Sequence, residues 1–95
     1  MTLRAFITAL AGPELIEAEA RVLRAGRPCG FILFARNIVD PAQVRRLISD
    51  AREAIGDDRT LVLVDQEGGR VQRLRPPHWR ALPPAQSYAQ AYARD

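Results

Sequence analysis

The sequence predicts an α/β fold in which parallel strands are joined by crossover helices. Three apolar stretches, at residues 4–10, 30–35 and 61–64, alternate with two segments of helical periodicity, at residues 14–25 and 41–55. The connections are short and each helical segment allows about three turns, which favours right-handed β-α-β units. This order suits the start of a doubly wound sheet and the start of a (β/α)8 barrel equally well.

The first expected unit is a strand over residues 4–10 followed by a helix over residues 14–25. Aromatic and β-branched residues favour the strand, which Gly12 and Pro13 interrupt. Pro13 suits the first turn of a helix, and apolar residues then recur at helical spacing. Gly26 is expected to end this helix.

The second unit repeats this plan with stronger signals. Residues 30–35 form a continuous apolar strand, and Asp40 then provides an N-cap before Pro41 at the first helical position. Gln43 stands where a capping box requires it, and Gly56 stops the helix. Apolar residues share one face of this helix: Val44, Leu47, Ile48, Ala51 and Ile55.

The third strand, over residues 61–64, leads into the most informative stretch of the chain. Its four residues are apolar without alternation, as expected of a parallel strand covered on both faces. Residues 65–73 then bring two carboxylates, a pair of glycines and two arginines. Charged residues at the carboxyl end of a buried strand are typical of ligand sites in α/β folds. A proline-rich irregular segment follows, and a last helix is expected over residues 84–94.

Composition limits the classes of function. The 95 residues allow one small domain, and all 14 basic residues are arginine. A net charge of +3 is too small and too dispersed to indicate a nucleic-acid partner, and no apolar run is long enough to span a membrane. The single cysteine, Cys29, excludes an internal disulfide, suits a reducing cytoplasm and is expected to be buried filler. No metal-spaced cluster, phosphate loop or dinucleotide fingerprint occurs in the sequence.

Two interpretations of residues 65–73 are open on chemistry alone. The carboxylate of Asp65 could accept hydrogen bonds from adjacent hydroxyls of a sugar, with the guanidinium of Arg73 holding the same ligand from the opposite side. Alternatively, Asp65 caps a turn while Arg70 or Arg73 pairs with Glu67. The residue types favour neither.

Three further candidates each have a structural alternative. His78 beside Trp79 could be a general base with a stacking platform, or a solvated loop residue. Asn37 follows the second strand and could reach the same rim as Asp65, or could simply form a turn. An anion-binding patch, or alternatively a solvated face, could be formed by four arginines: Arg70, Arg73, Arg75 and Arg80.

Four segments resemble the bacterial β-N-acetylhexosaminidases of glycoside hydrolase family 3, the cytoplasmic enzymes of peptidoglycan recycling. The strongest is the unbroken run Asp-Gln-Glu-Gly-Gly-Arg-Val-Gln-Arg at residues 65–73. Residues 30–37, 40–43 and 82–87 match family segments at consistent spacing. The similarity covers nearly the whole chain apart from the first dozen residues and residues 76–81.

This resemblance implies a (β/α)8 barrel with its active site at the carboxyl ends of the strands. It implies that Asp65 binds hydroxyls of N-acetylglucosamine and that Arg73 also contacts the substrate. Glu67 and Arg70 then become supporting residues. The substrate class it implies is a muropeptide-type glycan, hydrolysed with retention of configuration and without a metal or organic cofactor.

The resemblance also implies that residues 1–95 form only the N-terminal part of the barrel domain, which takes about 250 residues. The family's aspartate nucleophile and its loop histidine would lie beyond residue 95, so no catalytic residue is assigned here and the chain alone is expected to be inactive. An open sheet edge and an uncovered apolar face would favour self-association. Two alternatives are a non-catalytic sugar-binding module and an arginine-rich protein that binds anionic polymers.

Overall fold

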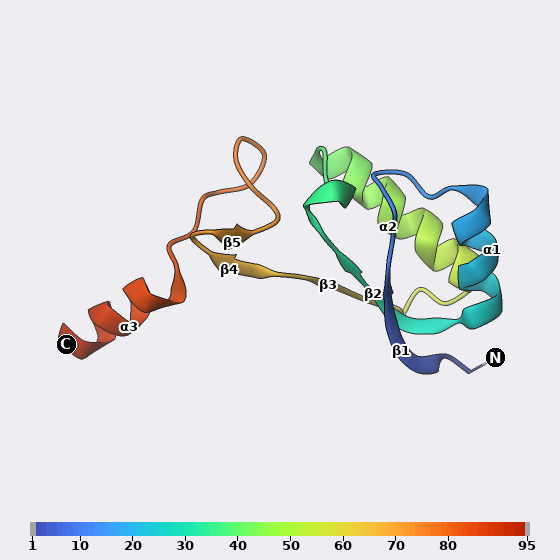
Figure 1. Cartoon of the computed structure of the whole chain (residues 1–95), viewed down its shortest axis with the longest axis horizontal. Helices are drawn as coiled ribbons and strands as arrows, with labels where there is room; N and C mark the ends of the chain where they lie inside the picture. Colours follow the sequence, from blue (N-terminus) through green and yellow to red (C-terminus); the bar gives the residue numbers. More distant parts are fainter. Residues whose placement is uncertain (1, 95) are drawn as a thin grey trace. The chain divides into compact units, whose positions relative to one another are not determined.

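The computed structural model describes residues 2–94, and the chain forms two compact units, Met1–Val64 and Asp65–Asp95. The first unit is a three-stranded parallel sheet with two helices (Figure 1). Its strands are β1 (Arg4–Ala9), β2 (Pro28–Leu33) and β3 (Leu61–Val64), adjacent in that order. Helix α1 (Glu17–Gly26) joins the first two strands, and α2 (Pro41–Ile55) joins the second pair. The predicted α/β class and the parallel pairing are confirmed.

Helices α1 and α2 pack side by side and cover one face of the sheet. Phe31 is fully buried in β2 and Leu33 is nearly so. They alternate with Ile32, which is only half-buried, so the covered face carries the odd-numbered residues of β2. The helices supply the remaining core residues: Ala20, Leu23, Val44, Leu47, Ala51 and Ile55.

The opposite face of the sheet is open, which contradicts the prediction that β3 is covered on both sides. Leu61 is 58% exposed and Leu63 is 36% exposed. Their register partners in β2 are Gly30 and Ile32, and Ile7 of β1 also pairs with Gly30, so all of them share this face. An apolar run without alternation predicts that both faces of the strand are covered, but it does not predict which segment covers each face. No element of the first unit covers this side.

Helix α1 begins at Glu17, three residues later than predicted, and Pro13 lies outside it. The preceding segment is held in a bend by contacts from residues distant in sequence. The carboxylate of Glu19 accepts the backbone N–H of Ala11 at 2.7 Å, and the amide of Gln43 donates to the Pro13 carbonyl at 2.6 Å. A helix that began at residue 14 would place the backbone groups of Ala11 and Pro13 differently, so these hydrogen bonds favour the later start.

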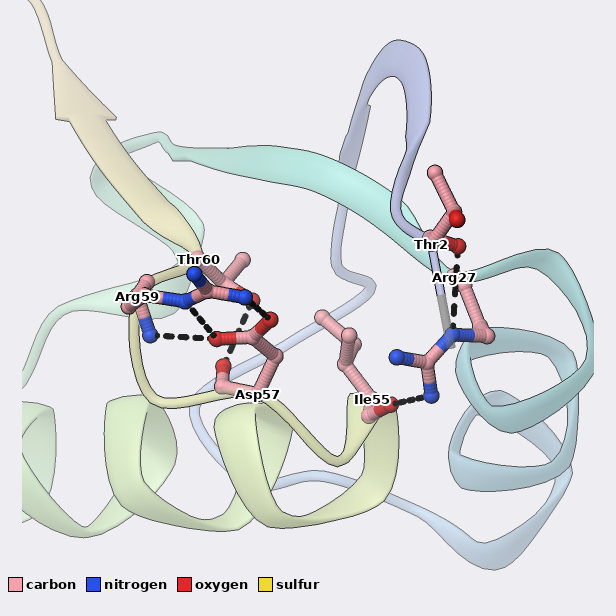
Figure 2. A network of polar contacts seen from close by, with 6 residues as sticks. All are labelled: Thr2, Arg27, Ile55, Asp57, Arg59 and Thr60. Carbon is pink, nitrogen blue, oxygen red and sulfur yellow. Dashed lines mark hydrogen bonds and ion pairs between the residues drawn. The ribbon is translucent and has the colours of Figure 1, made fainter.

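The helix ends at Gly26, as expected, but the left-handed cap is the next residue, Arg27, with φ of 49°. The Arg27 side chain explains why arginine occupies a position that glycine would tolerate more easily. Its Nη1 donates to the carbonyl of Ile55 at 2.6 Å and its Nε to that of Thr2 at 3.4 Å (Figure 2). Arg27 thus ties the end of α1 to the end of α2.

Helix α2 matches its sequence signals. Asp40 accepts the N–H of Gln43 at 2.7 Å, the Gln43 side chain accepts the N–H of Asp40, and Gly56 is the left-handed cap. Strand β2 spans residues 28–33 instead of 30–35, because Ala35–Asn37 forms a 3-10 turn. Cys29 therefore lies within the strand and is half-buried, with its thiol donating to the Phe6 carbonyl at 3.3 Å.

The turn that leads into β3 is closed by a short polar network. The Asp57 carboxylate pairs with Arg59 at 2.8 Å, and the buried Thr60 hydroxyl donates to the Asp57 carbonyl at 2.7 Å (Figure 2). Arg52 donates to the Thr60 carbonyl through Nε and Nη2. The start of β3 is therefore fixed to the end of α2.

The second unit consists of a two-stranded antiparallel hairpin, a loop and a helix. Strands β4 (Gln66–Gly68) and β5 (Val71–Gln72) form the hairpin, which the sequence analysis did not predict. Helix α3 (Ala85–Arg94) confirms the expected last helix. Its tyrosines, Tyr88 and Tyr92, are exposed. Within residues 2–94, no helix has the length and apolar character that crossing a membrane requires.

Candidate functional site

The hairpin brings Asp65 and Arg73 together at its open end. Asp65 directly precedes β4 and Arg73 directly follows β5, so the two residues face each other one step beyond the strand pair. The Arg73 N–H donates to the Asp65 carbonyl at 3.2 Å. The guanidinium Nη2 lies 3.9 Å from the carboxylate Oδ2. These two predicted site residues are therefore neighbours, whereas the pairing of Glu67 with Arg70 or Arg73 is not found among the described residues.

The carboxylate of Asp65 and the guanidinium of Arg73 do not fully satisfy each other. The side chain of Asp65 is 43% exposed and that of Arg73 is 31% exposed. A separation of 3.9 Å is beyond hydrogen-bond length, and a partly exposed ion pair of this kind contributes little free energy. Nε of Arg73 is buried and has no hydrogen-bond partner in the described chain. Carboxylate acceptors and guanidinium donors are thus both available to one polar ligand.

The paired glycines make this hairpin possible. Gly68 and Gly69 have φ of 89° and 59°, a backbone region that strongly favours glycine. The Gly69 N–H donates to the Leu82 carbonyl at 2.8 Å. A Cβ on Gly68 would collide with the Pro83 carbonyl, and a Cβ on Gly69 would lie 3.0 Å from Pro84. The turn therefore docks against residues 82–84.

Gln66 and Gln72 support the site, and sequence reasoning missed both. Their side chains bind the backbone of Leu74, and Gln72 also binds the Arg80 carbonyl and the Leu82 N–H. A detectable signal was their symmetric placement, one glutamine just inside each of the two charged residues. The supporting role that the resemblance implies for Glu67 and Arg70 is not observed, because both are exposed and their side chains make no hydrogen bond or ion pair with another described residue.

The other two candidate residues are His78 and Asn37, and the structure shows the contacts of both. His78 is exposed and its ring meets Trp79 edge-on, with ring centroids 5.9 Å apart. Asn37 is fully buried, and its amide donates to the carbonyls of Leu10 and Gly12 at 3.0 and 2.8 Å. Its side-chain oxygen accepts the Phe34 N–H, so Asn37 holds the turn after β2. Within residues 2–94, no group of three or more His, Cys, Asp or Glu side chains is placed to hold a metal ion.

The chain is similar in structure to β-N-acetylglucosaminidases of glycoside hydrolase family 3. NagZ from Neisseria gonorrhoeae, solved in complex with N-trifluoroacetyl-D-glucosamine, matches with a TM-score of 0.86 and 28% identity. The match covers 98% of this chain and 27% of that chain. A fungal multi-domain family 3 β-N-acetylglucosaminidase matches with a TM-score of 0.75 and 29% identity, over 87% of this chain and 10% of that one.

In sequence, the chain is similar to bacterial proteins named β-hexosaminidase. The protein from Mannheimia succiniciproducens is 45% identical over 80 residues, which cover 84% of this chain and 22% of that protein. The one from Methylobacillus flagellatus is 38% identical over 92 residues, or 97% of this chain and 26% of that protein. No protein-family model matches. The resemblance to β-hexosaminidases is confirmed, and the chain spans about a quarter of the length of these relatives.

Proposed function

We propose that this chain provides the sugar-binding hairpin of a β-N-acetylhexosaminidase that releases terminal N-acetylglucosamine. The observation that carries the proposal is the Asp65–Arg73 pair, held 3.9 Å apart and partly exposed at the open end of the hairpin. The similarity to proteins named β-hexosaminidase supports the reaction class. The sugar analogue bound to NagZ from Neisseria gonorrhoeae supports an N-acetylglucosamine-type ligand.

In the proposed complex, Asp65 and Arg73 bind the sugar without taking part in bond cleavage. The ionised carboxylate accepts hydrogen bonds from two neighbouring hydroxyls, and the guanidinium donates to the same ring. Binding groups of this kind fix the ring so that a nucleophile and an acid/base can act on opposite sides of the glycosidic bond. No residue of this chain is assigned either of those two roles.

We further propose that residues 1–95 contribute the first three strands of a (β/α)8 barrel as part of a family 3 domain. Three adjacent parallel strands with both crossover helices on one face support this architecture. The apolar face with Leu61 and Leu63 would become the barrel interior. As an isolated chain, this exposed face and the unpaired outer sides of β1 and β3 favour self-association, which light scattering would reveal as a mass above that of one chain.

The proposed biological substrate is a peptidoglycan fragment processed in the cytoplasm during cell-wall recycling. The resemblance of residues 65–73 to the recycling enzymes supports this assignment. A reducing compartment agrees with a single half-buried thiol at Cys29.

Titration of the full 95-residue chain with N-acetylglucosamine tests the proposed site. We expect millimolar binding that is insensitive to salt, lost in Asp65→Ala and retained in Asp50→Ala, which removes an exposed carboxylate from α2. Affinity for a polyanion that falls steeply with salt would instead favour the arginine-rich binding protein. The chain alone should not cleave a chromogenic N-acetylglucosaminide, and cleavage by the purified chain would contradict the assignment of catalysis to other residues.

A further inference from the structure

The two charged residues of the proposed site are flanked by two glutamines that bind one and the same residue. Gln66 follows Asp65 and Gln72 precedes Arg73, and the glutamines are register partners across the hairpin. Gln66 accepts the Leu74 N–H at 3.0 Å and donates to the Leu74 carbonyl at 2.8 Å. Gln72 donates to that carbonyl as well, also at 2.8 Å. We call Gln66 and Gln72 the glutamine clamp.

Gln72 is almost completely buried, and all the hydrogen-bonding groups of its side chain have partners. Gln72 is 4% exposed, and besides Leu74 its Nε2 donates to the Arg80 carbonyl at 2.7 Å. Its Oε1 accepts the Leu82 N–H at 2.9 Å. A buried carboxamide with both donors and its acceptor in use defines one arrangement of its partners. Gln72 therefore ties together the two ends of the loop over residues 74–82.

This arrangement fixes the backbone on both sides of the Arg73 side chain. The Arg73 N–H is held by the Asp65 carbonyl, and both polar groups of Leu74, the next residue, are held by the clamp. The direction in which the Arg73 side chain leaves the backbone is thus set by hydrogen bonds that do not involve its guanidinium group. Small displacements of a ligand-binding group are known to weaken its action strongly.

We propose that the glutamine clamp positions Arg73 beside Asp65, so that the two residues grip one sugar ring together; this inference rests on the proposed function. Gln66 and Gln72 are positioning residues, because the side-chain oxygen and nitrogen of each are bonded to backbone groups of residues 74–82. The isosteric change Gln72→Glu would place carboxylate oxygens against the carbonyls of Leu74 and Arg80. Gln72→Met keeps the length and the burial of the side chain but removes all its hydrogen bonds.

The first test needs no ligand and measures whether the loop over residues 74–82 stays ordered. Trp79 is the only tryptophan of the chain and lies in the loop, so its emission reports the loop alone. In Gln72→Met we expect a changed emission maximum and at least tenfold faster hydrogen exchange at the Leu82 amide, which loses its acceptor. Gln90→Met, an exposed glutamine on α3, is the matched control and should change neither. Unchanged exchange in Gln72→Met would overturn the clamp.

The second test separates positioning from a purely structural role by a double-mutant cycle. Titrating the full chain with N-acetylglucosamine, we expect Gln72→Met to weaken binding about tenfold when Arg73 is present and less than about twofold in an Arg73→Ala background. Equal effects in both backgrounds would show that Gln72 does not act through Arg73 and would overturn the inference. Circular dichroism checks that each variant is folded, and Gln66→Met repeats the cycle if Gln72→Met unfolds.

The outcomes distinguish this inference from the function on which it rests. If the unaltered chain fails to bind the sugar, the proposed function fails and the positioning inference fails with it, whatever the loop does. If the unaltered chain binds, Asp65→Ala abolishes binding and Gln72→Met binds normally, only the clamp is refuted.

Discussion

Gly68→Ala should detach the hairpin turn from the segment against which it docks. The added Cβ would collide with the Pro83 carbonyl oxygen and would lie 2.8 Å from the carbonyl carbon and 3.0 Å from the Leu82 oxygen. Because these are backbone atoms, no side-chain rotation relieves the contact. The φ of 89° adds a left-handed penalty of about 1–2 kcal/mol for an L-residue. Overpacking adds about 1–3 kcal/mol, so the docked state should lose about 3 kcal/mol in total.

Hydrogen exchange at the Gly69 amide measures this loss directly, because that N–H donates to the Leu82 carbonyl at 2.8 Å. A destabilisation of about 3 kcal/mol corresponds to exchange roughly a hundredfold faster. Gly12→Ala is the matched control, since a Cβ at Gly12 would meet nothing within 4 Å and its φ is not in the left-handed region. If the Gly69 amide exchanged as slowly in Gly68→Ala as in the unaltered chain, the docking contact would not exist and the reasoning would be wrong.

Three further predictions concern the first unit and are measured by thermal or denaturant unfolding. Asn37→Ala should destabilise it by about 2–4 kcal/mol, because the part-buried Phe34 N–H loses its acceptor and the Leu10 carbonyl loses a buried donor; a change below about 0.5 kcal/mol would refute the role assigned to Asn37. Arg27→Gly should be about 1 kcal/mol more stable than Arg27→Ala, because both lose the same side chain but only glycine relieves the φ of 49°; equal stabilities would argue against a left-handed cap. Hydrogen bonds from Arg59 hold the pKa of Asp57 well below its ordinary value, so the stabilisation is present above about pH 4 and is lost as the pH falls further. Asp57→Asn should therefore be less stable than the unaltered chain at neutral pH, with a difference that shrinks in acid, and a difference independent of pH would exclude this ion pair as its cause.

Local signals predicted the elements whose boundaries depend on nearby residues. The cap of α2 follows from Asp40, Pro41 and Gln43, all within one helical turn, and the structure reproduces it. The start of α1 could not be predicted in this way. The segment before it is held by two hydrogen bonds: the Glu19 carboxylate accepts a backbone N–H 8 residues away, and the Gln43 amide donates to a backbone carbonyl 30 residues away. Propensity within a short window contains no information about such contacts.

The candidate site shows the same division. The charge pattern after an apolar strand pointed to residues 65–73, the family resemblance selected Asp65 and Arg73 among them, and the hairpin places these two side by side. The roles of Gln66 and Gln72 were missed because they depend on the return of residues 74–82 over the hairpin. The exposure of Leu61 was missed for a related reason: an apolar strand predicts a covering layer, and that layer is not supplied by the first unit.

The most direct measurement of the central claim uses a chimeric enzyme. This chain replaces the matching segment of the β-hexosaminidase from Mannheimia succiniciproducens, to which it is 45% identical over 80 residues, and hydrolysis of a chromogenic N-acetylglucosaminide is measured. We expect an active chimera in which Asp65→Ala lowers kcat/KM roughly a thousandfold, because charged hydrogen bonds to two sugar hydroxyls are lost. Asp50→Ala should leave the rate unchanged. A folded chimera that is inactive, or an Asp65→Ala chimera as active as its parent, would contradict the claim that this carboxylate binds the sugar.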